Sequence, residues 1–133
     1  MQATTMFMGK PANIGEWKEW QLQAYVVQEA RRAGYCVAGD MNQGRRSGKQ
    51  AALAKATGML AGETDLRFYL PGAKICLIEL KKADGRMSEA QKQHHSHLMD
   101  LGFWPYVVYA HTPAGAWEKV HEILKDEAVV GRG

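Results

Sequence analysis

The sequence predicts a mixed α/β domain in which a small central sheet is flanked by helices, in the order α-β-α-β-β-α-β-α. Four segments carry helix start and stop signals, and four shorter runs of β-branched and aromatic residues are typical of strands. The 133 residues are 46% hydrophobic and 23% charged, which suits one folded domain with a buried core. This composition excludes a disordered tail, a collagen-like repeat and a disulfide scaffold.

The first helix is expected to follow a flexible N-terminal arm, residues 1–12, and residues 13–133 are expected to form a single domain. Asn13 and Glu16 have the spacing of a capping box, and Gly34 is a typical helix stop. The helix is predicted from about Ile14 to Ala33 because apolar residues recur at helical spacing, at Trp17, Trp20, Ala24 and Val27. Both tryptophans are expected to lie in the core.

A strand, a loop and a short helix are expected next. Tyr35–Ala38 is the strand, and Gly39–Gly48 is a polar, basic loop that contains glycine. Lys49–Thr57, rich in alanine and lysine, is the helix. Cys36 and Cys76 each lie within a short apolar run, so both are expected to be buried, as free thiols are in a reducing cytoplasm.

A hairpin and two further helices complete the domain. The strands Asp65–Leu70 and Lys74–Lys81 flank a turn at residues 71–73. Ser88, with Gln91 three residues later, is expected to cap a helix that stops at Gly102. The last strand is Tyr106–Tyr109, and the last helix runs from Pro113 to about Ala128.

The hairpin brings charged residues together. Strand side chains alternate between faces, so Glu79 and Lys81 project to the same side. If Leu70 pairs with Lys74, Asp65 lies opposite Glu79, with Cβ atoms about 4.5–5.5 Å apart. The same pairing joins apolar residues on the other face: Leu66 with Ile78, and Phe68 with Cys76.

Two carboxylates at that distance repel each other unless a cation lies between them. A hard divalent ion such as Mg²⁺, which takes one or two carboxylates together with water and substrate phosphate, fits this pair. Lys81, on the same face, is placed to polarise an attacking water or to stabilise charge on a phosphorane-like transition state.

Asp65, Glu79 and Lys81 match the PD-(D/E)xK nuclease pattern, and the sequence resembles the VRR-NUC branch of it, especially small stand-alone members from phages and bacteria. The resemblance runs from about Glu19 to Tyr109. Thr64 stands where the superfamily pattern has proline, a position that binds nothing. The similar segments are a Glu-to-Gln spacing in the first helix (19–23), an asparagine-glycine-basic loop (42–47), glycines ahead of Asp65 (58 and 62), and Ser88 with Gln91.

The resemblance implies a restriction-endonuclease-like fold and a role for each matched residue. Asp65 and Glu79 would bind Mg²⁺ or Mn²⁺ with the carbonyl oxygen of Leu80, and Lys81 would position the water. Glu19 would act through a metal-bound water or bind a second metal, with Glu16 and Glu29 as competing candidates on the same helix. Gln91 has two readings: it caps its own helix, or it reaches the scissile phosphate or orients Lys81.

The charge distribution adds a candidate DNA surface. The segment from Arg31 to Leu60 contains six basic residues and one acidic residue, Asp40. In the resemblance, Arg45, Arg46 and Lys49 would grip phosphates, while Asn42 and Ser88 are further DNA-contacting candidates. His94, His95 and His97 lack a further ligand for a tetrahedral site and are expected to be partly buried or amphipathic.

The function expected from these observations is a Mg²⁺- or Mn²⁺-dependent DNA endonuclease that hydrolyses phosphodiester bonds. In the resemblance it acts as a homodimer on branched DNA such as four-way (Holliday) junctions, in the cytoplasm of a bacterial host and encoded by the bacterium or a phage. No membrane segment and no small-molecule cofactor are expected. The alternatives are a catalytically silent nucleic-acid-binding module and a nuclease that acts on RNA.

Overall fold

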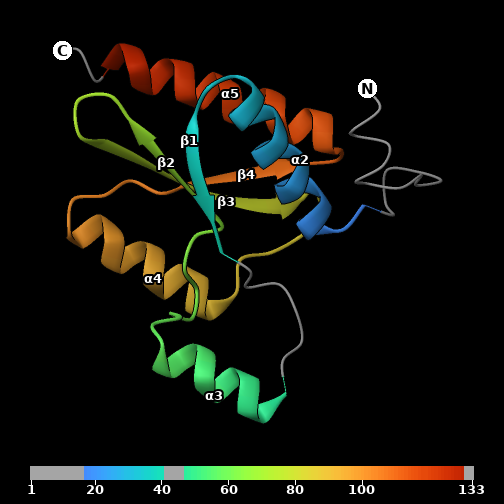
Figure 1. Cartoon of the computed structure of the whole chain (residues 1–133), viewed down its shortest axis with the longest axis vertical. Coiled ribbons are helices and arrows are strands. Elements are labelled where there is room, and N and C mark those ends of the chain that lie inside the picture. The colour runs from blue at the N-terminus through green and yellow to red at the C-terminus, as the bar shows by residue number, and fades with distance from the viewer. Residues whose placement is uncertain (1–16, 41–46, 131–133) are drawn as a thin grey trace.

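The structure is a computed structural model that describes residues 17–40 and 47–130, and its elements follow the predicted order (Figure 1). Apart from the start of the first helix, the described boundaries lie within two residues of the predicted ones. No described helix has the length and apolar character to cross a membrane. The elements are α2 (Glu19–Arg32), β1 (Cys36–Gly39), α3 (Gly48–Ala56), β2 (Leu66–Leu70), β3 (Lys74–Lys82), α4 (Glu89–Asp100), β4 (Tyr106–Ala110) and α5 (Pro113–Val130).

The four described strands form one mixed sheet in the order β1-β2-β3-β4. The pairs β1–β2 and β2–β3 are antiparallel, whereas β3 and β4 are parallel. Parallel neighbours need a crossover connection, and α4 provides it. The hairpin pairs Leu66 with Ile78 and Phe68 with Cys76, which confirms the predicted register.

One face of the sheet carries the core. Helices α2 and α5 lie together over this face, α4 lies on the opposite side, and α3 is the element farthest from the sheet (Figure 1). The buried apolar side chains alternate along the strands and repeat at helical spacing: Leu22, Val26, Ala30, Val37, Leu66, Phe68, Leu70, Cys76, Ile78, Leu80, Val108, Ala110, Ala116, Val120 and Leu124.

The end of α5 is fastened to the sheet by polar contacts. Lys74 Nζ lies 3.2 Å from a carboxylate oxygen of Glu127 and donates a hydrogen bond to the Glu127 carbonyl oxygen at 3.1 Å. The Tyr106 hydroxyl donates to the same carboxylate. One glutamate therefore joins α5 to the starts of both β3 and β4.

Three predictions about the first third of the domain were wrong. Helix α2 begins at Glu19, because Trp17 and Lys18 are not helical; the proposed capping residues, Asn13 and Glu16, lie outside the described residues. Trp20 is 47% exposed, because it lies about 200° around the helix from Leu22. Cys36 is exposed, because its strand neighbour Val37 faces the core instead.

Candidate active site

The side chains of the proposed catalytic centre project from the face of the sheet opposite the core. On β3, Ile78 and Leu80 enter the core, so Glu79 and Lys81 point the other way, toward α4. Asp65 directly precedes β2. All three charged side chains are nearly inaccessible, with exposures of 2% for Asp65, 1% for Glu79 and 7% for Lys81.

Asp65 is held by backbone contacts on two strands. Its Oδ2 accepts a hydrogen bond from the Leu80 N–H at 2.7 Å. Its own carbonyl oxygen accepts a hydrogen bond from the Asp40 N–H, just after β1, at 3.0 Å. These contacts fix the carboxylate beside β3, although the residue itself lies outside regular strand pairing.

The carboxyl groups of Asp65 and Glu79 interact. Burial raises the pKa of Glu79 far above its usual value, and the adjacent Asp65 carboxyl raises it further. Lys81 acts in the opposite direction. Two buried acids in contact are costly for a fold unless a cation joins them, so this arrangement has the electrostatic character of a cation site.

Helix α4 contributes two further contacts to Glu79. Gln91 Nε2 donates a hydrogen bond to Glu79 Oε2 at 2.8 Å. On the other side, His95 Nε2 lies 3.8 Å from Glu79 Oε1, too far for a hydrogen bond. Glu79 Oε1 and His95 Nε2 are both buried, and neither has a hydrogen-bond partner among the described residues.

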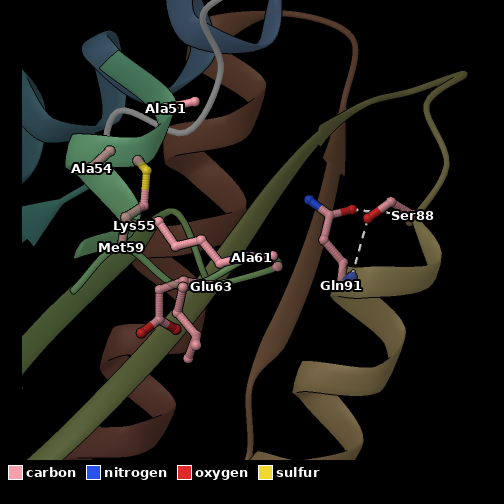
Figure 2. Close-up of a pocket in the computed structure, with 10 residues that line it drawn as sticks. Ala51, Ala54, Lys55, Met59, Ala61, Glu63, Ser88 and Gln91 are labelled. Atoms are coloured by element: carbon pink, nitrogen blue, oxygen red, sulfur yellow. Dashed lines mark hydrogen bonds between the residues drawn. The ribbon is translucent and has the colours of Figure 1, made fainter. Parts of the chain in front are cut away.

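Gln91 caps its own helix and contacts the site at the same time. Its Oε1 accepts a hydrogen bond from the Ser88 N–H at 2.8 Å, and its N–H donates to Ser88 Oγ at 3.1 Å. This is the predicted capping box, and Figure 2 shows the two side chains joined in this way. The free end of the amide contacts Glu79, a partner the sequence interpretation did not include.

Glu19 reaches the site from the first turn of α2. One carboxylate oxygen accepts a hydrogen bond from the Lys82 N–H at 3.3 Å, and the other lies 3.9 Å from Lys81 Nζ. Of its competitors, Glu29 pairs with Arg32 on its own helix at 3.6 Å, and Glu16 lies outside the described residues. Among the described glutamates of α2, Glu19 is therefore the one that contacts the lysine of the site.

A divalent metal ion fits the carboxylate pair. No group of three or more His, Cys, Asp and Glu side chains within residues 17–40 and 47–130 is arranged to hold a metal. Mg²⁺, however, needs only one or two protein carboxylates, because water and substrate phosphate supply its other ligands. The buried Glu79 Oε1, which lacks a partner in the described structure, is an oxygen that such an ion would satisfy.

The predicted DNA-binding residues divide into two groups. Asn42, Arg45 and Arg46 lie outside the described residues. Lys49 is exposed in the first turn of α3, and Ser88 is the N-cap of α4.

A cleft of about 550 Å³ lies between α3 and the start of α4. Figure 2 shows Ser88 and Gln91 on one side of it, with the α3 residues and the following segment on the other.

The sequence interpretation missed the role of the α4 histidines at this site. His95 is buried facing Glu79, and His94 Nε2 is hydrogen-bonded to Glu63 Oε1 at 2.9 Å. They follow Gln91 by three and four residues, so all three share one helix face. This spacing was visible in the sequence, but it matches neither an apolar stripe nor a tetrahedral metal site. The expectation of partly buried histidines is correct for His94 and His95, whereas His97 is exposed.

Comparisons with known proteins place the fold. No protein-family model and none of the curated proteins matches the sequence. The solved structures that resemble this chain include two VRR_NUC domains. One, described as "VRR_NUC domain", has 20% identity and a TM-score of 0.52, covering 80% of this chain and 94% of its own. The other, "VRR_NUC domain protein", has 22% identity and a TM-score of 0.56, covering 80% and 88%. The chain therefore has the fold of these domains, and the predicted fold class is confirmed.

Proposed function

We propose that this chain is a metal-dependent nuclease of the VRR-NUC type that hydrolyses phosphodiester bonds in DNA. The fold shared with two VRR_NUC domain structures supports the family. The observation that carries the proposal is the burial of two interacting carboxyl groups, Asp65 and Glu79, beside Lys81 on one face of the sheet. Hydrolysis of a phosphodiester needs a cation, an oriented water and charge stabilisation, and these groups can provide all three.

Asp65 and Glu79 would hold Mg²⁺ or Mn²⁺, together with the carbonyl oxygen of Leu80. The ion would acidify a bound water and neutralise charge that develops on the phosphate. The Leu80 N–H donates to Asp65, so the same residue orients one proposed ligand and offers another through its carbonyl oxygen. Gln91 orients the second ligand by donating to Glu79.

Lys81 would hold the attacking water or a phosphate oxygen through its ammonium group. Its burial restricts the side chain, and a Glu19 carboxylate oxygen lies 3.9 Å from its Nζ. Glu19 thereby acts as a positioning residue. Its part as a second-metal ligand or through a metal-bound water stays a proposal.

Burial of the acids favours a nuclease over a catalytically silent binding module. Two carboxyl groups in contact destabilise a fold and would repel the phosphates of a nucleic acid. A module that only binds gains nothing from them, whereas a metal-dependent enzyme requires them. RNA remains the alternative substrate, and it is separated from DNA by the experiment below.

We further propose that the enzyme acts as a homodimer on branched DNA such as four-way junctions. One site cuts one strand per engagement, and a two-fold dimer would present two sites related by the symmetry of the two strands to be cut. The proposed location is the cytoplasm of a bacterial host, from a bacterial or phage gene. The free thiols of Cys36 and Cys76 suit such a reducing compartment.

The decisive experiment compares labelled four-way junction, linear duplex, single-stranded DNA and RNA, each with Mg²⁺, Mn²⁺ or EDTA. We expect cleavage of DNA only with metal, and loss of cleavage in Asp65→Ala, Glu79→Ala and Lys81→Ala. Lys125→Ala, at an exposed lysine on α5, is the matched control and should cleave normally. Circular dichroism and thermal melting check that each variant folds.

Full cleavage by any of the three site variants would contradict the site assignment. Equal cleavage of junction and duplex would remove the branch selectivity but leave the nuclease. Light scattering that gives the mass of one 14.8 kDa chain would remove the dimer.

A further inference from the structure

The cleft between α3 and α4 has the size and chemistry of a ligand site. Its volume of about 550 Å³ lies within the range of roughly 300–1,000 Å³ that is usual for small-molecule pockets. Three separate segments line it: one side of α3, residues 59–63, and the first turn of α4 with its N-cap. Its walls are largely apolar, formed by Ala51, Ala54, Met59, Leu60 and Ala61.

The apolar wall of the cleft is exposed in the described structure. Helix α3 has no buried residue, and Leu60 is 52% exposed. An amphiphilic ligand that covered this wall would therefore remove apolar surface from water. The polar lining consists of Lys55, Glu63, Ser88 and Gln91.

The floor of the cleft is rigidly attached to α4. Gly62 has a φ of +83°, and a Cβ there would lie 2.3 Å from the carbonyl oxygen of Ala90. Only glycine allows this approach. The next residue, Glu63, accepts hydrogen bonds from the Thr64 N–H at 2.9 Å and is joined to His94. This side of the cleft is thus fixed to α4.

One end of the cleft adjoins the proposed catalytic centre. Gln91 lines the cleft and also donates to Glu79 at 2.8 Å. Helix α3 contributes Lys55 to the lining and contains no acidic residue, and the carboxylate of Glu63, the acid of the lining, is hydrogen-bonded to His94. A ligand for this place combines negative charge with a flat apolar body, and a nucleotide has both.

We propose that this cleft binds the base of a nucleotide next to the scissile phosphate, unstacked from its neighbours. The inference rests on the proposed function and adds a reason for its substrate class. An unpaired base is the least costly to remove from a stack, so nucleotides at branch points and in single strands would enter most easily. The apolar wall would cover the face of the unstacked base, while Lys55 would contact a phosphate.

Two matched variants on α3 test the proposal. Ala51→Trp fills the mouth of the cleft, whereas Ala52→Trp places the same side chain on an exposed position that does not line it. Neither alanine is buried, so both variants are expected to fold. Affinity for a short single-stranded oligothymidine and for an abasic strand of equal length is measured by fluorescence anisotropy in EDTA, and the oligomeric state by light scattering.

We expect the parent and Ala52→Trp to bind the base-containing strand at least about 5-fold more tightly than the abasic strand. Ala51→Trp should lose much of this preference and keep its affinity for the abasic strand. Equal affinity of the parent for both strands, or equal behaviour of the two variants, would overturn the proposal. So would a change of mass in Ala51→Trp alone, because the cleft would then be a contact between two copies of the chain.

The cleavage assay separates this inference from the proposed function. Metal-dependent cleavage without the base preference leaves the nuclease and removes the base site. A base preference that Ala51→Trp abolishes, in a protein that cleaves no substrate, leaves the base site and removes the nuclease.

Discussion

The Nε2 atom of His95 lies 3.8 Å from Oε1 of Glu79, and within the described structure neither atom has a hydrogen-bond partner. Burial lowers the pKa of His95, and the neighbouring His94 lowers it further, so the imidazole is neutral near pH 7 and does not compensate a charge on Glu79. The carboxyl group is thus stabilised on one oxygen, by Gln91, and unsatisfied on the other.

The first prediction is that near pH 7 Glu79→Gln does not destabilise the metal-free protein and stabilises it by up to about 2 kcal/mol, because a neutral amide avoids the cost of burying or protonating an acid beside Asp65. Metal should reverse the order. At 100 times its dissociation constant, Mn²⁺ would stabilise the parent by about 2.7 kcal/mol and the variant by much less. Urea unfolding in EDTA and in MnCl₂ measures both effects.

Glu118→Gln, at an exposed carboxylate on α5, is the control and should respond to metal as the parent does. A variant that is clearly less stable than the parent in EDTA would mean that the carboxylate supports the fold rather than a cation.

The second prediction concerns the lysines of α3. Lys49→Ala and Lys55→Ala, made singly and together, should weaken DNA binding similarly for all sequences. Each lost phosphate contact should reduce the slope of log affinity against log salt by about 0.9. Titrations across several salt concentrations provide the slope. Lys125→Ala, remote on α5, should not change it, and an unchanged slope in the double variant would exclude α3 from the DNA surface.

The third prediction compares two glycines with positive φ. Gly62→Ala adds a methyl group 2.3 Å from the Ala90 carbonyl oxygen, whereas Gly58→Ala at φ +107° meets no atom within 4 Å. Gly58→Ala should cost about 1–2 kcal/mol from backbone strain alone. Gly62→Ala should cost at least about 2 kcal/mol more, because α4 and the segment before Asp65 must separate. Equal losses in chemical denaturation would show that the contact with α4 is not rigid.

The fourth prediction is a pH dependence at Glu127. The hydrogen bond from Tyr106 and the ion pair with Lys74 hold the pKa of Glu127 below its usual value of 4.5. A lowered folded-state pKa stabilises the protein above the unfolded value, and this contribution is lost as the pH falls through the folded value. Glu127→Gln should therefore cost about 1 kcal/mol at pH 7 and progressively less below about pH 4.5.

Urea unfolding of the parent and Glu127→Gln at several pH values measures this difference. Glu118→Gln, at an exposed carboxylate on the same helix, should show no such trend. A Glu127→Gln penalty that stays constant from pH 7 to pH 3 would disprove the electrostatic explanation.

The hairpin and its two faces were predictable because two constraints agree. The turn at residues 71–73 fixes which residues pair, and the alternation of apolar and charged side chains fixes which face is buried. With this turn fixed, the resulting pairing puts Leu66 and Ile78 in the core while Glu79 and Lys81 face away. The convergence of Asp65, Glu79 and Lys81 follows from that pairing.

Helix orientation was harder to predict. At the C-cap of α4 the apolar Leu101 is 61% exposed, while the polar His95 within the helix is buried. The inner side of α4 covers polar groups rather than the apolar core, so hydrophobic periodicity selects the wrong residues. Trp20 shows the same limit on α2, where a large apolar residue lies on the outer side. Which side of a helix faces inward depends on what the helix packs against, and α4 packs against a charged site.

The alternation along β3 has a practical consequence for handling the protein. A shift of β3 by one residue against β2 would move Glu79 and Lys81 into the apolar layer beneath α2 and α5, and would move Ile78 and Leu80 to the opposite side. No partly shifted sheet keeps both a dry interior and an assembled catalytic centre. For the proposed nuclease, DNA cleavage recovered after denaturation would therefore measure the fraction of molecules whose strands have paired correctly, a property that far-ultraviolet spectra cannot distinguish.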